Sequence, residues 1–515
     1  MNDSSTGRMA LISVSDKTRI EELARFITEK GLRILATQNT YSTLKQAGID
    51  AVEVSEYTGY PEMMDGRVKT LHPKIFAGIL CNRDNHNSEL EKFAIANIDL
   101  LVVNLYPFQR LASTKILPDN KMIEQIDIGG VSLLRAGAKN FQHVTVVSDV
   151  HDYEGLMQEM SNHEGATTLE YRRAMAARAF ARVASYDACI HSWLVGNTGE
   201  PKMPQEIIIH GKKVQDLRIG ENPHQKAAVY SVYEGGLPMA LPIEQMHGKE
   251  LSFNNVVDVE SAVRIVAEFD IPAVSVIKHG NPCGAAVSSV EIDDAYEKAI
   301  TCDPKSSFGG VIAFNREVTA DIAKKVSEVF IEAVVAPSFA EEALEILCKK
   351  KSLRVIKCRP YPTSGLVLKS TLGSGFLLQE RDNSMVGISD FLKVTTKEAP
   401  PEALHDLLFA WKVCKHVKSN AIVIARDGRA IGVGAGQMSR VDSVEIAVKK
   451  AQDCTDTVMA SDAFFPFADS VQHAVAAGIS AIVQPGGSVR DKEVIDAANS
   501  SGIAMYFTGF RSFCH

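Results

Sequence analysis

The first 150 residues alternate between short apolar runs and longer stretches in which apolar residues recur every three or four positions. The apolar runs at 10–14, 32–37, 100–105 and 143–148 are rich in β-branched residues, which is typical of buried strands. The stretch IEELARFITEKG at 20–31 has the helical period, and the preceding SDKT supplies N-cap residues for a helix start. This alternation predicts a doubly wound α/β domain with a parallel sheet.

Small and polar residues follow three of these predicted strands directly. The chain reads SVSDK after the first strand, ATQNT after the second and NLYPF after the third. Open α/β sheets bind ligands outside the carboxyl ends of their strands. We therefore expect a binding site at this edge of the first domain.

A long helical stretch at 168–194 is followed by a segment that breaks every periodic pattern. This segment, VGNTGEPKMPQ at 195–205, is rich in Gly, Pro and Asn, which is typical of a linker. A chain of 515 residues is also too long for one hydrophobic core. We therefore predict one domain at 1–198 and another region at 199–515.

The second half of the chain contains an internal repeat. AVSVIKHG at 273–280 aligns with AIVIARDG at 421–428, and IEAVVAP at 331–337 aligns with ISAIVQP at 479–485. Both pairs have the same offset of 148 residues, 421 minus 273 and 479 minus 331. Chance similarity between apolar strands is an alternative, but two pairs at one offset favour a duplicated α/β subdomain. A binding cleft is then expected between the two copies.

Composition and charge narrow the possible functions. The chain has 55 Lys and Arg against 63 Asp and Glu, a formal net charge of -8 at pH 7. This balance argues against nucleic acid or a membrane surface as a partner, and we find neither a signal peptide nor a membrane-spanning run. The nine cysteines form no C-x-x-C pair, which favours reduced thiols and a cytoplasmic protein.

Two motifs of the first domain predict an anion site. GRVKTLHPKIFAG at 66–78 brings together four polar side chains, those of Arg67, Lys69, Thr70 and His72. DIGGVSLLRAGAKN at 127–140 opens a helix with two glycines. Arg and Lys bind phosphate as a planar fork and a point charge, and free N–H groups at a helix start add donors. A solvated basic loop and a simple glycine turn are the structural alternatives.

The segment VIKHGNPCG at 276–284 places Lys278 and His279 at the end of an apolar strand. The second copy has Arg426 and Asp427 there, so we expect chemistry in the first copy only. Zinc-deaminase chemistry needs H-x-E and P-C-x-x-C, and this segment lacks both the Glu and the second cysteine. We therefore predict no metal and interpret the pair as a proton-transfer pair, with ordinary strand-end residues as the alternative.

The segment DAFFPFADS at 462–470 has three phenylalanines, which are interrupted by Pro466 and followed by Asp469. A core segment would bury the aromatic rings. A flat slot for a heterocycle would instead stack against them and use Asp469 as a hydrogen-bond acceptor. Both interpretations stay open from the residues alone.

Taken in order, these motifs resemble the bifunctional AICAR (aminoimidazole-carboxamide ribonucleotide) formyltransferase/IMP cyclohydrolase family of purine biosynthesis. The resemblance runs along the whole chain, through SVSDKT, PEMMDGRVKTLHP, NLYPF, QIDIGGVSLLRAGAKN, ENPHQ, KELSFNN, KHGNPCG, SSFGG, GAGQMSR and SDAFFPF. It implies a methylglyoxal-synthase-like cyclohydrolase domain and a formyltransferase domain of two cytidine-deaminase-like α/β subdomains. The implied reactions are formyl transfer from 10-formyltetrahydrofolate to the 5-amino group of AICAR, and closure of formyl-AICAR to IMP with loss of water.

The resemblance also implies site residues, carried over position by position. In the formyltransferase, Lys278 and His279 match the proton-transfer pair, and Asn420 matches a residue that holds the reacting groups. In the cyclohydrolase, the ring-closing groups match Lys69, Tyr106, Asp127 and Lys139. The remaining matched positions bind substrate: Ser13, Ser15, Lys17, Thr37, Thr40, Arg67, Thr70, Asn104, Gly129, Gly130, Arg218, Gly220, Asn255, Gly309, Glu332, Arg440, Phe464, Pro466, Phe467, Asp469 and Arg511.

Partners follow from the same resemblance. Within that set, Phe464 matches a base-stacking residue, and the following aromatic segment with Asp469 matches a folate slot. Arg218 and Asn255 match residues that reach across a dimer interface, so a homodimer with shared formyltransferase sites is implied. The implied co-substrate is 10-formyltetrahydrofolate, and neither reaction requires a metal or a redox cofactor.

Two positions depart from the family pattern. The family usually reads Ser-Gly-Gly-Thr where this chain has Thr37-Gln38-Asn39-Thr40, and Arg-Tyr-Gly where it has Arg218-Ile219-Gly220. Loss of two glycines restricts the backbone beside the expected phosphate site. An alternative is therefore a formyltransferase with a weak or inactive cyclohydrolase domain. A third hypothesis, a non-catalytic nucleotide or folate sensor, is disfavoured because the catalytic positions are retained.

Overall fold

The computed structural model describes residues 8–114, 116–198, 203, 205–234, 237–238, 241–359, 366–371 and 373–515. Contacts divide the chain into two compact units. The first comprises Met1–Lys212 with Tyr230–Met239, and the second comprises Lys213–Val229 with Ala240–His515. The predicted boundary after residue 198 meets residues 199–202, which lie outside the described ranges, so its position stays a prediction.

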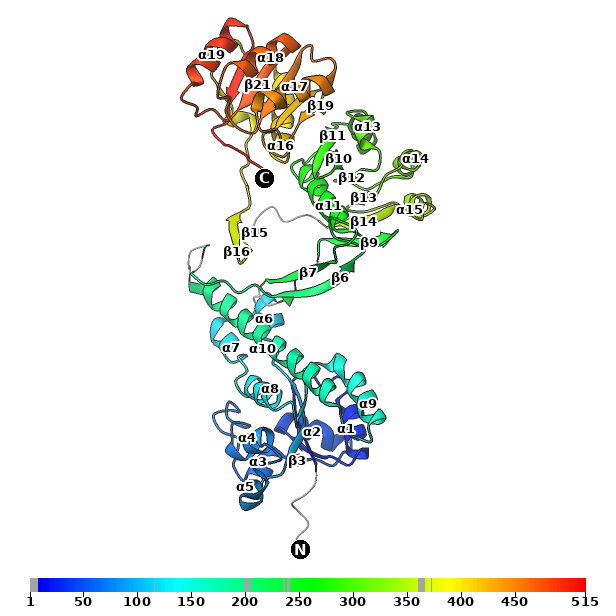
Figure 1. Cartoon of the computed structure of the whole chain (residues 1–515), viewed down its shortest axis with the longest axis vertical. Coiled ribbons are helices and arrows are strands. Elements are labelled where there is room, and N and C mark those ends of the chain that lie inside the picture. Colours follow the sequence, from blue (N-terminus) through cyan, green and yellow to red (C-terminus); the bar gives the residue numbers. More distant parts are fainter. Residues whose placement is uncertain are drawn as a thin grey trace. The chain divides into compact units, whose positions relative to one another are not determined.

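A five-stranded parallel sheet forms the centre of the first unit (Figure 1). Its strands are β1 Met9–Val14, β2 Arg33–Ala36, β3 Val52–Glu53, β4 Ile98–Asn104 and β5 Thr145–Val147, in the order β3-β2-β1-β4-β5. Successive side chains of a strand point to opposite faces of the sheet. In β1, Ala10 and Ile12 accordingly pack into one hydrophobic cluster, and Met9 and Leu11 pack into another.

Helices cover both faces of this sheet. Their bounds are α1 Ile20–Glu29, α2 Gln38–Gln46, α3 Val54–Thr58, α4 Pro73–Leu80, α5 Asn87–Lys92, α6 Phe108–Thr114, α7 Asp119–Ile123, α8 Gly129–Lys139, a 3-10 helix Val150–Asp152, α9 Tyr153–Asn162 and α10 Leu169–Thr198. Helices α1, α2 and α9 supply apolar side chains to one face, and α4, α8 and α10 supply them to the other. The predicted doubly wound α/β domain is therefore confirmed.

The first helix lacks the N-terminal cap that the sequence predicts. It starts at Ile20, and the N-cap residue Arg19 has φ 57° and no side-chain cap. The backbone N–H groups of Ser15 and Asp16 instead donate to Asn104 Oδ1, at 2.5 and 2.9 Å. The prediction that SDKT caps the helix is wrong, because the neighbouring strand end binds these donors and holds the segment at the edge of the sheet.

A twelve-stranded sheet forms the centre of the second unit. Its strands are β9 Ile243–His247, β10 Ala273–Lys278, β11 Asn281–Val287, β12 Val311–Phe314, β13 Ala333–Ala336, β14 Arg354–Cys358, β17 Leu392–Lys393, β18 Ile422–Arg426, β19 Arg429–Gly434, β20 Thr457–Ser461, β21 Ile479–Gln484 and β22 Ala504–Phe507. Their order is β17-β22-β21-β20-β18-β19-β11-β10-β12-β13-β14-β9. The sheet consists of two six-stranded halves, which meet where β11 pairs with β19 in antiparallel fashion.

The remaining elements complete this unit and the segments around it. The helices are α11 Phe253–Val266, α12 Ile292–Ile300, α13 Pro304–Ser307, α14 Ala320–Glu328, α15 Glu341–Leu347, a 3-10 helix Ile388–Asp390, α16 Pro401–Cys414, α17 Arg440–Ala451, α18 Asp469–Ala477 and α19 Asp491–Ser500. The other strands are β6 Gly211–Leu217, β7 Ala227–Glu234, β8 Leu237–Pro238, β15 Leu366–Thr371 and β16 Gly375–Glu380. No helix in the described part of the chain is long and apolar enough to cross a bilayer.

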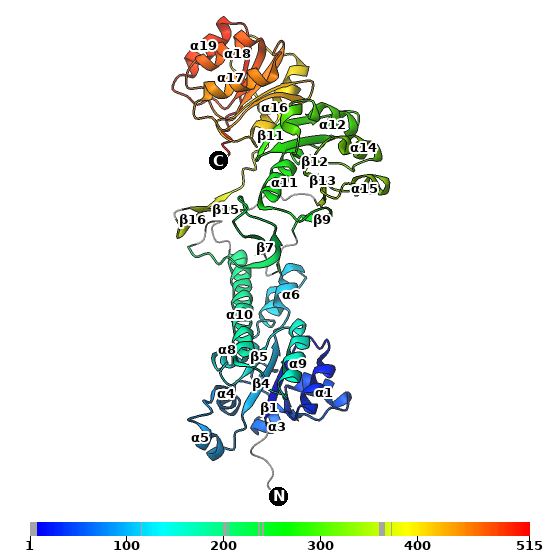
Figure 2. The same cartoon turned by 45° about the vertical axis from the view of Figure 1, so that its right-hand side comes forward.

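The two halves of the sheet are copies of one fold (Figure 2, green and orange to red). Each half has a hairpin, then three parallel strands and an antiparallel edge strand. Helices α11 and α16 correspond residue for residue at the offset of 148. Both helices contribute to one hydrophobic cluster, which spans the two halves. The predicted duplication is therefore confirmed.

Candidate active sites

The first unit contains a cavity of about 600 Å³ at the carboxyl edge of its sheet. The strand order reverses between β1 and β4, which is where open α/β sheets bind ligands. The predicted site residues that line the cavity are Ser13, Ser15, Lys17, Thr37, Arg67, Lys69, Thr70, Asn104, Tyr106, Asp127, Gly129 and Gly130. The structure thus brings five segments from distant parts of the chain to one place.

Two ammonium groups approach each other in this cavity. Burial lowers the pKa of Lys17, and the positive charge of Lys69 lowers it further. Lys17 Nζ donates to Val14 O and, at 3.2 Å, to Thr40 Oγ1. Lys69 Nζ donates to the Tyr106 hydroxyl at 3.3 Å. Because an anion between them would relieve their repulsion, the arrangement favours a phosphate-bearing ligand.

Asp127 lies where α8 begins. Its Oδ1 accepts a hydrogen bond from Gly130 N at 2.7 Å. Burial raises the pKa of Asp127, although the backbone hydrogen bonds from Gly130 and Tyr106 oppose this shift. A carboxyl group with a raised pKa takes up a proton more readily, which suits a role in proton exchange. A Cβ at position 130 would lie 2.4 Å from Asp127 Oδ2, so a side chain there would displace this carboxylate.

A residue of the long helix α10 anchors the loop that carries Asp127. The Tyr186 hydroxyl accepts a hydrogen bond from Asp127 N at 2.8 Å and donates one to Gln125 O at 2.9 Å. Tyr186 is buried in a hydrophobic cluster with Phe108, and this burial raises the pKa of its phenol. Sequence reasoning missed Tyr186, because no local motif links it to Asp127 across 59 residues.

The segment Thr37-Gln38-Asn39-Thr40 forms the start of α2. Thr37 is the N-cap residue with φ -72°, Gln38 opens the helix, and no residue of the segment has a positive φ. Thr37 and Asn39 line the cavity, whereas Thr40 is buried behind it. The two glycines of the family pattern are therefore not needed, because any L residue adopts this backbone. The helix start also offers free N–H groups, which suit an anion.

Two predicted residues of the first unit are placed differently from the rest. Lys139 is the exposed last residue of α8, whereas Gly129 at the first turn lines the cavity. A rise of about 1.5 Å per residue separates the two helix ends by roughly 15 Å. Arg67 lines the cavity, but its guanidinium group pairs with Glu124. The role of Lys139 stays a prediction. An anion in the cavity would have to compete with Glu124 for the guanidinium group of Arg67.

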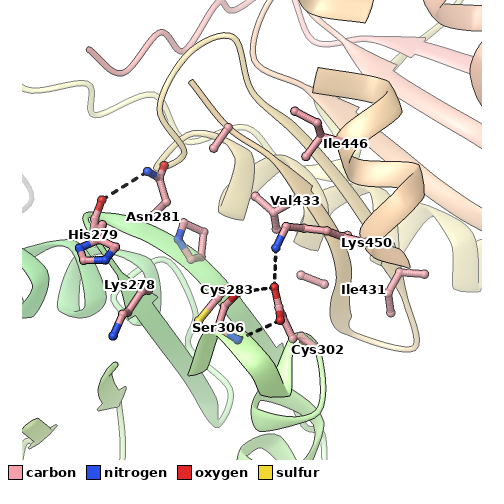
Figure 3. A pocket seen from close by; sticks show the side chains of 15 residues that line it. Lys278, His279, Asn281, Cys283, Cys302, Ser306, Ile431, Val433, Ile446 and Lys450 are labelled. Atoms are coloured by element: carbon pink, nitrogen blue, oxygen red, sulfur yellow. Dashed lines mark hydrogen bonds and ion pairs between the residues drawn. The ribbon is translucent and has the colours of Figure 1, made fainter. Parts of the chain in front are cut away.

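The second unit contains a cavity of about 280 Å³ between the two copies, where the cleft was predicted (Figure 3). That it binds a ligand stays a prediction. The first copy contributes Lys278, His279, Asn281, Pro282, Cys283, Cys302, Asp303 and Ser306. The second copy contributes Ala430, Ile431, Gly432, Val433, Ala435, Ile446 and Lys450. An ion pair of 2.5 Å between Lys450 Nζ and Asp303 Oδ2 joins the two sides.

Lys278 is the last residue of β10, and His279 follows it at the edge of this cavity. Lys278 Nζ donates to the carbonyl groups of Phe308 and Gly309, at 3.0 and 2.9 Å. Gly309 has φ 68°, and a Cβ there would lie only 3.1 Å from Lys278 Nζ. His279 is exposed and has φ 53°, a conformation that L residues rarely adopt. The turn thus fixes the ammonium group and leaves the imidazole accessible.

Asn281 connects this turn to the loop that carries Asn420. Asn281 Nδ2 donates to His279 O at 3.4 Å, as the dashed line in Figure 3 shows. Asn281 Oδ1 accepts from Lys418 N at 3.0 Å. The loop before Asn420 is thereby held against the turn with Lys278 and His279.

Asn420 belongs to a buried polar cluster of the second copy. Arg440 donates to Asn420 Oδ1 at 2.6 Å, to Asp462 Oδ1 at 2.5 Å and to Ser461 Oγ at 2.8 Å. Arg440 is 7% exposed, so its guanidinium group is largely enclosed by these partners. The hydrogen bond from Arg440 orients the side chain of Asn420. The contact of Arg440 with a ribonucleotide stays a prediction.

The other predicted residues of the second unit do not line the cavity between the copies. Glu332 pairs with the buried Arg354 at 2.6 Å, and Asn255 forms a capping box with Ser252 at the start of α11. Gly220 packs against Gln225, whose Cβ leaves no room for a side chain. The remaining side chains are exposed or half-buried, and their roles stay predictions: Arg218, Phe464, Pro466, Phe467, Asp469 and Arg511.

The aromatic segment fits both interpretations in part. Phe465 is fully buried in a hydrophobic cluster of the second copy. Phe464 and Phe467 are 37% and 46% exposed, and Arg490 lies over the Phe467 ring at 4.6 Å from its centroid. One ring therefore builds the core, whereas the other two are partly exposed, and the slot for a heterocycle stays a prediction.

Several residues of the second cavity were not foreseen from the sequence. Besides Asn281, they include Asp303, Lys450 and the thiols of Cys283 and Cys302. Burial raises the pKa of these thiols to about 12 and about 11, so they are poor nucleophiles at neutral pH. Within the described ranges, no three His, Cys, Asp or Glu side chains form a group that could hold a metal ion.

Comparison with known proteins identifies the family. The AICARFT/IMPCHase bienzyme family matches residues 137–450, and the MGS-like domain family matches residues 19–132. A bifunctional purine biosynthesis protein PurH of Dinoroseobacter shibae is 48% identical, over 99% of this chain and 99% of its own. Those of Persephonella marina and Oceanobacillus iheyensis are 48% and 46% identical, over 99% of this chain and 100% of their own.

Two α/β units, each with a cavity lined by groups able to exchange protons, define an enzyme with two active sites. The chain belongs to the AICARFT/IMPCHase bienzyme family. It is an enzyme of purine biosynthesis with AICAR formyltransferase and IMP cyclohydrolase activities. The alternative of an inactive first domain is not favoured, because relatives that are named bifunctional match the chain along both units.

Proposed function

We propose that formyl transfer takes place at the turn beside the second cavity. The 5-amino nitrogen of AICAR attacks the formyl carbon of 10-formyltetrahydrofolate, the bond from this carbon to N10 breaks, and N10 takes up a proton. His279 accepts the proton that the amino group loses, and the Lys278 ammonium stabilises the charge on the formyl oxygen. The supporting observation is the adjacent pair at the end of β10, with the ammonium fixed by two carbonyl groups.

We propose that the cavity of the first unit closes the ring. The carboxamide nitrogen of formyl-AICAR attacks the formyl carbon, and the adduct then loses water to give IMP. Asp127, Lys69 and Tyr106 exchange the protons of these steps. The hydrogen bond between Lys69 and Tyr106 and the raised pKa of Asp127 support this assignment. Lys17 and the helix starts of α2 and α8 would bind the phosphate of the ribonucleotide.

Replacement of His279 by Ala tests the first assignment. Positioned proton transfer contributes about 10²–10⁴ in rate, so we expect formyl transfer to fall at least about 100-fold. Conversion of formyl-AICAR to IMP by the same sample should not change, which makes it an internal control for folding. An unchanged transfer rate would exclude His279 as the proton carrier.

Two finer assignments rest on the family. We propose 10-formyltetrahydrofolate as the formyl donor and the cytoplasm as the compartment. All nine cysteines are free, as expected in a reducing compartment. AICAR should be formylated when 10-formyltetrahydrofolate is present and not when formate replaces it. Equal transfer from formate would contradict the proposed donor.

We also propose a homodimer whose formyltransferase sites are shared between subunits. The exposed Arg218 and Arg511, which do not line the cavity of their own chain, support this proposal. Mixed dimers of the His279→Ala and Arg218→Ala variants provide the test. Random pairing restores one intact site in half of the dimers, so about a quarter of the wild-type rate should return. No recovery would mean that each site is built by one chain.

A further inference from the structure

A carboxylate outside the cavity holds the turn that carries His279. Asp258 of α11 accepts a hydrogen bond from Gly280 N at 2.7 Å, and it also accepts one from the backbone N–H of His279. His279 and Gly280 have φ 53° and 73°, so both residues are left-handed. This conformation is unfavourable for a residue with a side chain, and it persists only where surrounding groups hold it. Asp258 accepts hydrogen bonds from the backbone N–H groups of both residues and so helps to hold them in it.

The second copy contains the same arrangement without the catalytic pair. Asp406 of α16 lies 148 residues after Asp258 and accepts from Asp427 N at 2.9 Å and Gly428 N at 2.7 Å. Asp427 and Gly428 have φ 53° and 68°. Burial raises the pKa of both carboxyl groups, and the backbone hydrogen bonds oppose the shift at both. The two turns share one backbone geometry, but the first contains His279 after Lys278, whereas the second contains Asp427 after Arg426.

We propose that Asp258 is a positioning residue for formyl transfer. It fixes the backbone of His279 in the left-handed conformation and thereby the position of the imidazole at the edge of the cavity. Asp258 does not line the cavity, so it acts through His279 and not on the substrate. This inference deepens the proposed function and rests on the role of His279 in it.

The pair of equivalent aspartates offers a matched test. Asp258→Asn keeps one acceptor oxygen but turns amide hydrogens toward the second N–H group, so the turn loses a hydrogen bond and a charge. Because misplacement by about 1 Å costs up to about 10²-fold, we expect kcat of formyl transfer to fall about tenfold or more. The KM for AICAR should stay within about twofold. Asp406→Asn makes the same change in the other turn and should leave kcat unchanged.

Three results would overturn the proposal. Equal losses of kcat in the two variants would mean that the carboxylate only stabilises the unit. A raised KM with unchanged kcat would mean that Asp258 acts on substrate binding. If Asp258→Asn does not fold, Asp258→Glu keeps the charge and both acceptors while shifting them by one methylene. A wild-type kcat in that variant would also contradict a positioning role.

The double variant separates this inference from the proposed function. If Asp258 acts through His279, Asp258→Asn should add no loss to that of His279→Ala. A further loss of about tenfold in the double variant would mean that Asp258 acts independently, and the role of His279 would still stand. An unchanged rate in His279→Ala alone would instead remove the proposed function, and the inference with it. Ring closure of formyl-AICAR should proceed at the wild-type rate in every variant.

Discussion

Replacement of Tyr186 by Phe should impair ring closure and spare formyl transfer. The Tyr186 hydroxyl binds Asp127 N at 2.8 Å and Gln125 O at 2.9 Å, and the residue is only 2% exposed. Phe keeps the ring and removes both hydrogen bonds. Asp127 then loses an anchor that holds its carboxylate beside Gly130 at the start of α8.

The expected loss of stability and of activity follows from the two hydrogen bonds of the Tyr186 hydroxyl. A buried hydrogen bond contributes about 1 kcal/mol, and leaving its partner unpaired costs about 1–3 kcal/mol. With two partners left unpaired, we expect the free energy of unfolding of the first unit to fall by about 2–4 kcal/mol. Part of this free energy is lost in the transition state when Asp127 is misplaced. Each 1.4 kcal/mol or so lost in this way slows ring closure about tenfold.

The assay follows IMP formation from formyl-AICAR, and formyl transfer to AICAR is measured on the same sample. Tyr171→Phe is a matched control on the same helix. Tyr171 is half-buried, and its hydroxyl has no hydrogen bond within the described part of the chain. Wild-type ring closure by Tyr186→Phe, together with the expected loss of stability, would refute the coupling between Tyr186 and Asp127.

Two further predictions concern other contacts. Gly130→Ala places a Cβ 2.4 Å from Asp127 Oδ2, so ring closure should fall about tenfold or more while formyl transfer persists. Unchanged ring closure would show that the Asp127 carboxylate moves freely. Burial would raise the pKa of Glu268, but the hydrogen bond and charge of His416, with the charge of Lys415, lower it from 4.5 to about 2. Because the pKa of Glu268 is lower in the folded state than in the unfolded state, its ionised carboxylate stabilises the fold above pH 4.5. On the order of 3 kcal/mol of this free energy of unfolding should be lost as the pH falls toward 2. Glu268→Gln should flatten the pH dependence of unfolding in this range, and an unaltered dependence would contradict the reasoning.

The sequence by itself determined the kinds of elements and their repetition. The apolar runs at 10–14 and 100–105 form β1 and β4, because a strand covered on both faces needs apolar residues in succession. The offset of 148 residues, visible in two short pairs, extends to whole helices and to the order of the strands. Lys278 and His279 stood out because the second copy has Arg426 and Asp427 at the equivalent strand end, and their catalytic role stays a prediction.

Only the tertiary structure decided which residues act together. Asn281 meets Lys418 from 137 residues away, and Tyr186 meets Asp127 from 59 residues away. Lys139 belongs to the same motif as Gly129, yet it lies at the far end of α8. A local pattern encodes burial and backbone conformation, since these depend on neighbours along the chain. The partner of a polar side chain depends on how whole elements pack, so it emerges only when the sheet and its helices are assembled.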